Sequence, residues 1–121
     1  MNYQWIDEYA FTKQGIHKDY KKEWDWNRYL LNEKLVLAVC HDKEGKDIVT
    51  LKCEPSFAIE LRSQHEGIVE GYYMNKTHWS SVYLDGSVPD EVIKIMIDQS
   101  YELILKSFSK KKQRDITGVV A

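Results

Sequence analysis

The clearest hydrophobic pattern in the chain predicts an antiparallel hairpin. Two apolar, β-branched runs, Leu35–His41 and Ile48–Cys53, flank the turn-forming segment "DKEGKD", which is typical of two strands joined by a short loop. Pairing about that turn places Cys40 near Val49. The first run is apolar on both faces and the second alternates, so we expect a central first strand and a second strand with one face in solvent.

Amphipathic spacing predicts a helix at the start of the chain and another in its middle. Between Tyr3 and Lys13, apolar residues recur at helical spacing until Gly15 ends the pattern. The segment "PSFAIELRSQH" places Pro55 in a first helical turn. Its inward-facing residues are expected to be Phe57, Ala58 and Leu61.

The longest apolar stripe predicts a C-terminal helix. The segment "DGSVPDE" is its start signal, with a turn at Asp85 and Gly86 and a cap at Ser87. Beyond Gln113 no period remains, so residues 114–121 are expected to form a frayed tail. The stripe consists of Val92, Ile93, Met96, Ile97, Ser100, Tyr101, Ile104 and Phe108.

The remaining segments complete an α+β domain. A polar loop leads into the alternation from Trp24 to Tyr29, which predicts one strand, and Ile68–Met74 and Thr77–Leu84 predict two more, joined by "NK". No linker or repeat divides the chain. We therefore predict a single domain over residues 1–121, an antiparallel β-sheet carrying N-terminal, middle and long C-terminal helices.

Composition and charge narrow the functional classes. The chain has 121 residues, 30% of them charged, and a formal net charge of -2, which lacks the strongly basic character of a dedicated nucleic-acid binder. No apolar run is long enough to cross a membrane, and no secretory signal is visible, so a cytoplasmic location is expected. The one basic run, "KSFSKKKQR", is interpreted as a solvated helix end, where cations suit the helix dipole.

The cysteines and histidines predict neither a disulfide nor a metal centre. In the predicted hairpin, Cys53 lies near Val36, which separates it from Cys40 by about 13 Å, beyond disulfide reach. Both are therefore expected to be buried free thiols. The histidines, His17, His41, His65 and His78, show no paired spacing, and no cofactor is expected.

The segment "GYYMNKTHWSSVYLDGSVPDE" concentrates the chemistry of the chain. On a strand, His78 and Ser80 point to one face, but no strained nucleophile turn or glycine-rich oxyanion loop accompanies them. Trp79 and Tyr83 point to the opposite face, with Lys76 at the strand's start. That face either packs in the core or stacks nucleic-acid bases beside a cation.

These residues resemble the MmcQ/YjbR family of small bacterial proteins. The matching segments are "LKCEP", "ELRSQHEGI" and "GYYMNKTHWSSVYLDGSVPDEVIKIMIDQSYELI", from about Lys34 to Leu105. The resemblance implies an α+β fold of the frataxin-like kind and a non-enzymatic, DNA-binding function through strand-and-loop wings. Many members have histidine where this chain has Tyr73, which removes any role for an imidazole there.

Matched to the family's motif, the candidate DNA-binding residues are Asn75, Lys76, His78, Trp79, Lys52 and Arg62. Two further hypotheses stay open. Exposed aromatic residues would also suit a protein-interaction module, and an enzyme around His78 and Ser80 would require both side chains in one concave pocket. The frataxin-like fold also suggests iron binding, but Asp7 and Glu8 offer too few carboxylates on the first helix. Monomer is the default oligomeric state.

Overall fold

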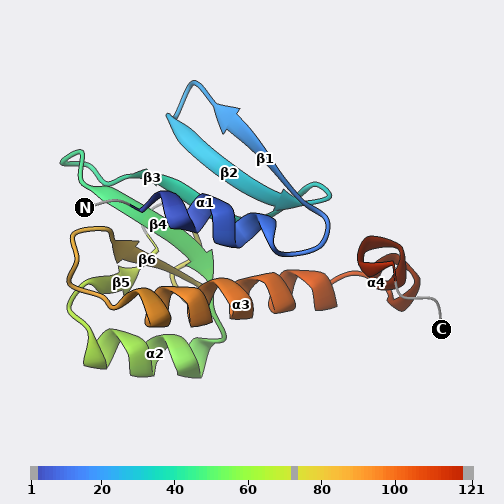
Figure 1. Ribbon diagram of the computed structural model, residues 1–121. Helices are drawn as coiled ribbons and strands as arrows, with labels where there is room; N and C mark the ends of the chain where they lie inside the picture. Colours follow the sequence, from blue (N-terminus) through green and yellow to red (C-terminus); the bar gives the residue numbers. More distant parts are fainter. Residues whose placement is uncertain (1–2, 72–73, 119–121) are drawn as a thin grey trace.

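A six-stranded antiparallel sheet organises the molecule (Figure 1). The computed structural model describes residues 3–71 and 74–118. The strands lie in the order β1-β2-β3-β4-β6-β5, which confirms the predicted α+β class. Their bounds are β1 Ile16–Lys21, β2 Trp26–Leu31, β3 Lys34–His41, β4 Asp47–Lys52, β5 Ile68–Glu70 and β6 Trp79–Tyr83.

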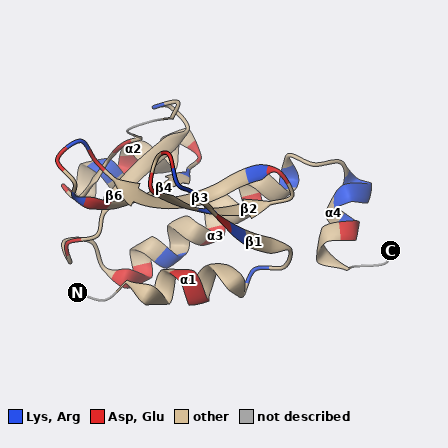
Figure 2. Cartoon of the chain, turned by 90° about the horizontal axis from the view of Figure 1, so that it is seen from above, with Lys and Arg blue, Asp and Glu red and all other residues tan. Residues whose placement is uncertain are grey.

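Helices cover one face of the sheet. Seen from above, α1 and α3 lie on the same side of the strands (Figure 2), and Ala58 and Leu61 of α2 join the same core as the buried residues of α1 and α3. Buried apolar side chains hold these helices in place, as their periodic spacing predicts. The helices are α1 Gln4–Phe11, α2 Pro55–Gln64, α3 Asp90–Lys106 and α4 Lys110–Thr117.

The register of the β3–β4 hairpin differs by one residue from the prediction. Cys40 pairs with Ile48, not with Val49. The turn is the cause: the Gly45 N–H donates to the Asp42 carbonyl at 3.0 Å, and Gly45 has a φ of 83°. This is a three-residue loop with glycine in the left-handed region, which shifts the pairing relative to an even-numbered loop. Both cysteines are nevertheless buried and free.

The prediction that β4 shows one face to solvent is wrong. Thr50 is fully buried, although it faces away from the helices. Its hydroxyl lies 2.9 Å from that of Ser81 on β6, and Met74 packs against a second small cluster on this side. Both faces of β4 are therefore covered.

The predicted polar loop before Trp24 is in fact strand β1. Its side chains are mostly exposed, because β1 is an edge strand that pairs only with β2. Charged residues are common on such edges, since they prevent pairing with another chain. The strand was not predicted because its residues are mostly polar and show no apolar alternation.

The connection between β5 and β6 is longer than the predicted two-residue turn. β5 ends at Glu70 and β6 begins at Trp79, so the expected strands Ile68–Met74 and Thr77–Leu84 are too long. Positions 72 and 73, which include the tyrosine that stands where many family members have histidine, lie outside the described residues. The side-chain oxygen of Asn75 accepts hydrogen bonds from the backbone of the residues that follow it, which makes this segment a side-chain-stabilised turn.

The C-terminal region contains two corrections. Ser87 does not cap α3, since Pro89 holds the cap position and no side chain caps the helix. The expected frayed tail is helical as far as Thr117, and the lysine run begins α4 instead of ending α3. No helix among the described residues has the length and apolarity that a membrane crossing requires.

Candidate functional site

The helix-free face of the sheet holds the candidate site. Residues directly opposite each other on paired strands share a face, and Arg28, Ala38, Thr50 and Ser81 form one such row. This row lies on the side away from the helices. A small apolar cluster made of Trp26, Ala38, Cys40 and Ile48 forms the floor of the face.

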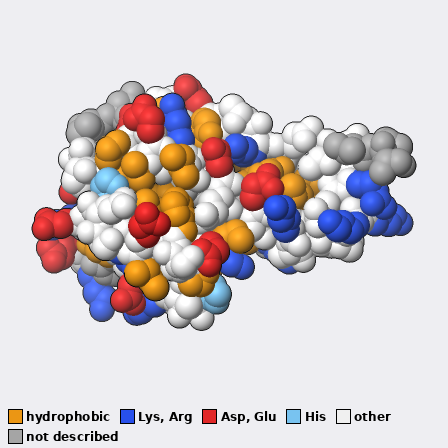
Figure 3. All heavy atoms as spheres, turned by 90° about the horizontal axis from the view of Figure 1, so that it is seen from below, with side chains coloured by type: hydrophobic (Ala, Val, Ile, Leu, Met, Phe, Trp, Pro, Cys, Tyr) orange, Lys and Arg blue, Asp and Glu red, His pale blue; other side chains and the backbone are white. Residues whose placement is uncertain are grey.

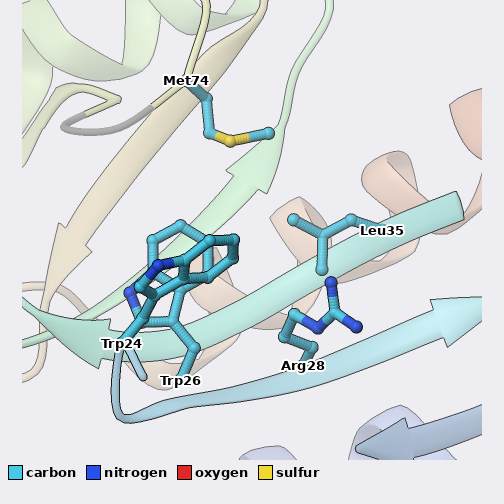
Figure 4. Close-up of a pocket in the computed structure, with 5 residues that line it drawn as sticks. All are labelled: Trp24, Trp26, Arg28, Leu35 and Met74. Atoms are coloured by element: carbon cyan, nitrogen blue, oxygen red, sulfur yellow. The ribbon is translucent and has the colours of Figure 1, made fainter. Parts of the chain in front are cut away.

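A cavity of about 580 Å³ opens on this face. Figure 4 shows two indole rings at one end, Met74 across from them, and the Arg28 guanidinium beside Leu35. The volume falls in the range of small-molecule binding pockets. The lining residues are Trp24, Trp26, Arg28, Leu35 and Met74.

Trp24 is the most accessible aromatic residue of the cavity. It lies in the β1–β2 turn, where Asp25 adopts a φ of 54°, and 58% of its surface is exposed. Its ring meets Trp26 edge-on with centroids 5.3 Å apart, and the Lys21 ammonium lies 5.8 Å from its centroid. Trp26 is buried and packs against Trp24, while more than half of the Trp24 surface stays exposed to solvent.

Arg28 places a fixed cation at the cavity. Two of its nitrogens donate to both carboxylate oxygens of Asp19, at 2.8 and 2.5 Å. These hydrogen bonds raise the pKa of Arg28 and lower the pKa of Asp19. The remaining terminal nitrogen, Nη1, makes no hydrogen bond to the described residues, so it is available to a ligand acceptor.

The structure brings two predicted site residues to this face. Lys52 on β4 and Trp79 on β6 are direct cross-strand partners, on the same side as Arg28. Standard strand spacings place Lys52 about 12 Å from Arg28. Lys52 and Trp79 are both half-buried, and neither lines the cavity itself.

Three other predicted residues form the turn before β6. Asn75 is structural, because its side chain accepts from the Thr77 N–H at 2.9 Å. The Lys76 ammonium donates to the Gly71 carbonyl at 3.3 Å. His78 is exposed, and its carbonyl accepts from the Cys53 N–H at 2.7 Å. Lys76 and His78 are exposed residues of this turn, and the Lys76 ammonium is engaged by a backbone carbonyl.

Arg62 lies on the other side of the sheet. Its Nη1 donates to the Ser80 hydroxyl at 3.3 Å, and the sheet separates it from Lys52. Ser80 is fully buried, so its hydroxyl is not presented to a substrate beside His78. Burial also raises the pKa of the nearby Cys53 thiol to about 11, which keeps this thiol protonated and unreactive at neutral pH.

Metal-ligand geometry is missing from the described part of the chain: no group of three or more His, Cys, Asp or Glu side chains there is arranged to hold an ion. The frataxin analogy raised Asp7 as a possible iron ligand. Its carboxylate accepts hydrogen bonds from the Lys18 ammonium at 2.8 Å and the Tyr29 hydroxyl at 2.7 Å. Those partners, Lys18 first, lower the pKa of Asp7.

The sequence contains a signal for the cavity that is separate from its hydrophobic periodicity. The segment "WDW" places two tryptophans around an aspartate, and Asp tolerates the left-handed conformation that tight turns need. Interpreting it as a hairpin turn would have predicted two aromatic side chains near one turn. Leu35 and Met74 reach the same cavity only through tertiary structure.

Comparisons with known proteins agree with the resemblance seen in the sequence. The family model described as YjbR matches residues 9–103. The chain is 32% identical to the protein YjbR of Escherichia coli K12 over 107 residues, covering 88% of this chain and 90% of that protein. It is 36% identical to YyaQ of Bacillus subtilis strain 168 over 103 residues, with 84% and 82% covered.

Solved structures show the same fold. The crystal structure of Deinococcus radiodurans protein DR2400 matches with a TM-score of 0.80 and 25% identity, covering 95% of this chain and 86% of that one. A Pseudomonas syringae protein matches with a TM-score of 0.71 and 27% identity, covering 85% and 98%. The names of these proteins state no activity, so the site must be interpreted from its own geometry.

Proposed function

This chain belongs to the YjbR family, and we propose that it is a non-enzymatic DNA-binding protein that holds single-stranded DNA on its helix-free sheet face. One observation carries the proposal. An exposed tryptophan, Trp24, is fixed edge-on against a buried one beside a cavity large enough for a base. Stacking on an aromatic ring contributes about 1–3 kcal/mol per base and tolerates any base sequence.

The surrounding cations support the same ligand. Lys21 lies next to Trp24, Arg28 lines the cavity while its guanidinium is paired with Asp19, and Lys52 stands farther along the sheet. A base stacked on Trp24 would place its flanking phosphates within reach of these groups. Single-stranded DNA fits better than duplex, since bases inside a duplex are already stacked.

Fluorescence anisotropy of labelled oligothymidine and of a duplex of mixed sequence tests the proposal. We expect roughly micromolar binding of the single strand at about 50 mM salt, weaker binding of the duplex, and a steep loss at about 200 mM salt. Quenching of tryptophan fluorescence should follow the same isotherm. No binding of the single strand at the lower salt concentration would overturn the proposal.

A second candidate is a protein-interaction site. Four of the five cavity-lining residues are apolar, and tryptophan is enriched among the residues that dominate interface energies. This candidate predicts a partner whose binding depends on Trp24 but only weakly on salt. A strong salt dependence together with stacking-type fluorescence quenching by DNA would count against it.

A further inference from the structure

The C-terminal end of the molecule carries an excess of positive charge. Of the 17 basic and 19 acidic side chains, five basic and one acidic fall in residues 103–118, which leaves 12 basic and 18 acidic elsewhere. The basic ones are Lys106 at the end of α3 and Lys110, Lys111, Lys112 and Arg114 on α4, which we together call the α4 basic cluster. A near-neutral chain therefore contains one strongly positive end.

The α4 basic cluster is exposed and unpaired. All five side chains are solvent-exposed, and no ion pair joins them to a carboxylate among the described residues. Figure 3 shows Lys and Arg side chains gathered on the end that projects beyond the body of the molecule, the end at which Figure 1 places α4. The positive potential there is not neutralised internally.

The local structure increases this potential. Because the run begins α4, its three lysines lie at the positive end of the helix dipole, where cations are unfavourable. Lys34 adds a further cation nearby, since its ammonium donates to Ser107 and lies 4.4 Å from the Phe108 ring centroid. Binding of an anion would relieve the repulsion among these cations.

We infer that the α4 basic cluster binds the sugar-phosphate backbone of the strand whose bases stack at Trp24. The inference rests on the proposed function: Trp24 contacts the bases, and the α4 basic cluster contacts the phosphates of the same strand. The Trp24 cavity lies at the turn between β1 and β2, whereas α4 lies near the opposite end of that hairpin, where Ile116 approaches Gly15. Six-residue strands separate the two ends by about 20 Å, a span of several nucleotides.

The test compares two variants with the same change in net charge. Lys110→Gln with Lys111→Gln removes two positive charges from α4, and glutamine keeps a similar helix propensity. Ile59→Glu with Gln64→Glu adds two negative charges at exposed positions of α2, on the helical side. Oligothymidine binding is measured for both variants and the parent between about 50 and 200 mM salt.

We expect the α4 variant to flatten the slope of log K against log salt by about 1.4, or about 0.7 for each lost phosphate contact. The α2 variant should keep the parental slope. A parental slope in the α4 variant would overturn this inference, while binding that still depends on Trp24 would leave the proposed function standing. Failure of the parent to bind would overturn both.

A membrane surface is the competing polyanion. Vesicles containing phosphatidylserine, mixed with the parent and the α4 variant, distinguish it. Vesicle binding that requires Lys110 and Lys111, combined with an unchanged DNA salt slope, would show that the cluster serves lipid and would overturn the inference. Absence of vesicle binding, with a flattened DNA slope, is the expected result.

Discussion

At the scale of single residues, Ser100 shows how a polar side chain can be part of an apolar stripe. It is fully buried on α3. Its hydroxyl donates to the Val36 carbonyl at 2.6 Å and accepts from the Lys52 N–H at 3.0 Å. The register shift between β2 and β3 skips Val36, and Lys52 on β4 lies just beyond the last pair of β3 with β4, Leu37 with Leu51. Ser100 therefore satisfies groups that the sheet leaves unpaired.

Replacing Ser100 by Ala should reduce the free energy of unfolding by about 1–3 kcal/mol for each backbone group left unsatisfied. Urea denaturation followed by circular dichroism measures the change. Ser63→Ala, at an exposed position of α2, is the matched control and should change stability little. Equal effects of the two substitutions would show that the Ser100 hydroxyl has no special role.

Asp42 predicts a pH dependence. Burial alone would raise its pKa, but hydrogen bonds from the Lys46 N–H, the Tyr83 hydroxyl and the Glu44 N–H outweigh burial and hold the pKa below the usual value of an aspartate. A carboxylate with a lowered pKa stabilises the fold above its unfolded pKa. That contribution is lost as the pH falls through the folded pKa.

Asp42→Asn should therefore be less stable than the parent at neutral pH, and the difference should shrink as the pH falls below about 4. Thermal unfolding at a series of pH values measures both proteins. The other carboxylates titrate in the same pH window, but they are present in both proteins. Their effect therefore cancels in the difference in stability between the two proteins at each pH. A difference that stays constant down to pH values near 2 would contradict the assigned role.

At the scale of elements, periodicity predicted the buried ones and missed the exposed ones. The apolar spacing predicts α3, the β3–β4 hairpin and α2, because burial imposes the pattern. β1 and α4 were missed, because an edge strand and a projecting helix bury little. The Trp24 cavity was missed for a related reason: residues far apart in sequence build it.

The docking of α4 can be tested at Gly15. This residue has a φ of 84°, and an added Cβ would lie 2.8 Å from Ile116 and 3.0 Å from Leu31. Gly45 has a similar φ of 83° but nothing within 4 Å. Alanine at either position meets the left-handed backbone penalty of about 1–2 kcal/mol, but only at Gly15 does it also overpack the interior.

We expect Gly15→Ala to cost more stability than Gly45→Ala, by roughly 1–3 kcal/mol. In an Ile116→Ala background the excess should fall, because the added methyl group then has room on that side. Chemical denaturation of Gly15→Ala and Gly45→Ala, each in the parent and in the Ile116→Ala background, measures these differences. Equal costs at the two glycines would mean that α4 does not pack against the start of β1.

At the scale of the whole molecule, the proposed DNA interaction uses two separated surfaces. The sheet leaves one face free of helices, and that face carries the aromatic cavity. The chain's excess positive charge lies at the projecting end instead. A net charge of -2 is therefore compatible with nucleic-acid binding, because the acidic body and the basic end are segregated.

The resemblance in the sequence predicted the family and the fold, both of which are confirmed. It predicted the candidate site less well. Lys52 and Trp79 share the helix-free face, but Arg62 lies behind the sheet. Spacing along a chain does not reveal which side of a sheet a helix packs on, so side-chain placement of that kind required the structure.

The most direct test of the central claim is oligothymidine binding by Trp24→Ala, with Phe11→Ala as control. Both aromatic side chains are exposed, Trp24 by 58% and Phe11 by 47%, but Phe11 lies on α1, on the helical side. Loss of one stacked base should weaken Trp24→Ala by about 5-fold to 150-fold, with the salt slope unchanged. Phe11→Ala should bind like the parent. Parental affinity in Trp24→Ala would contradict the account.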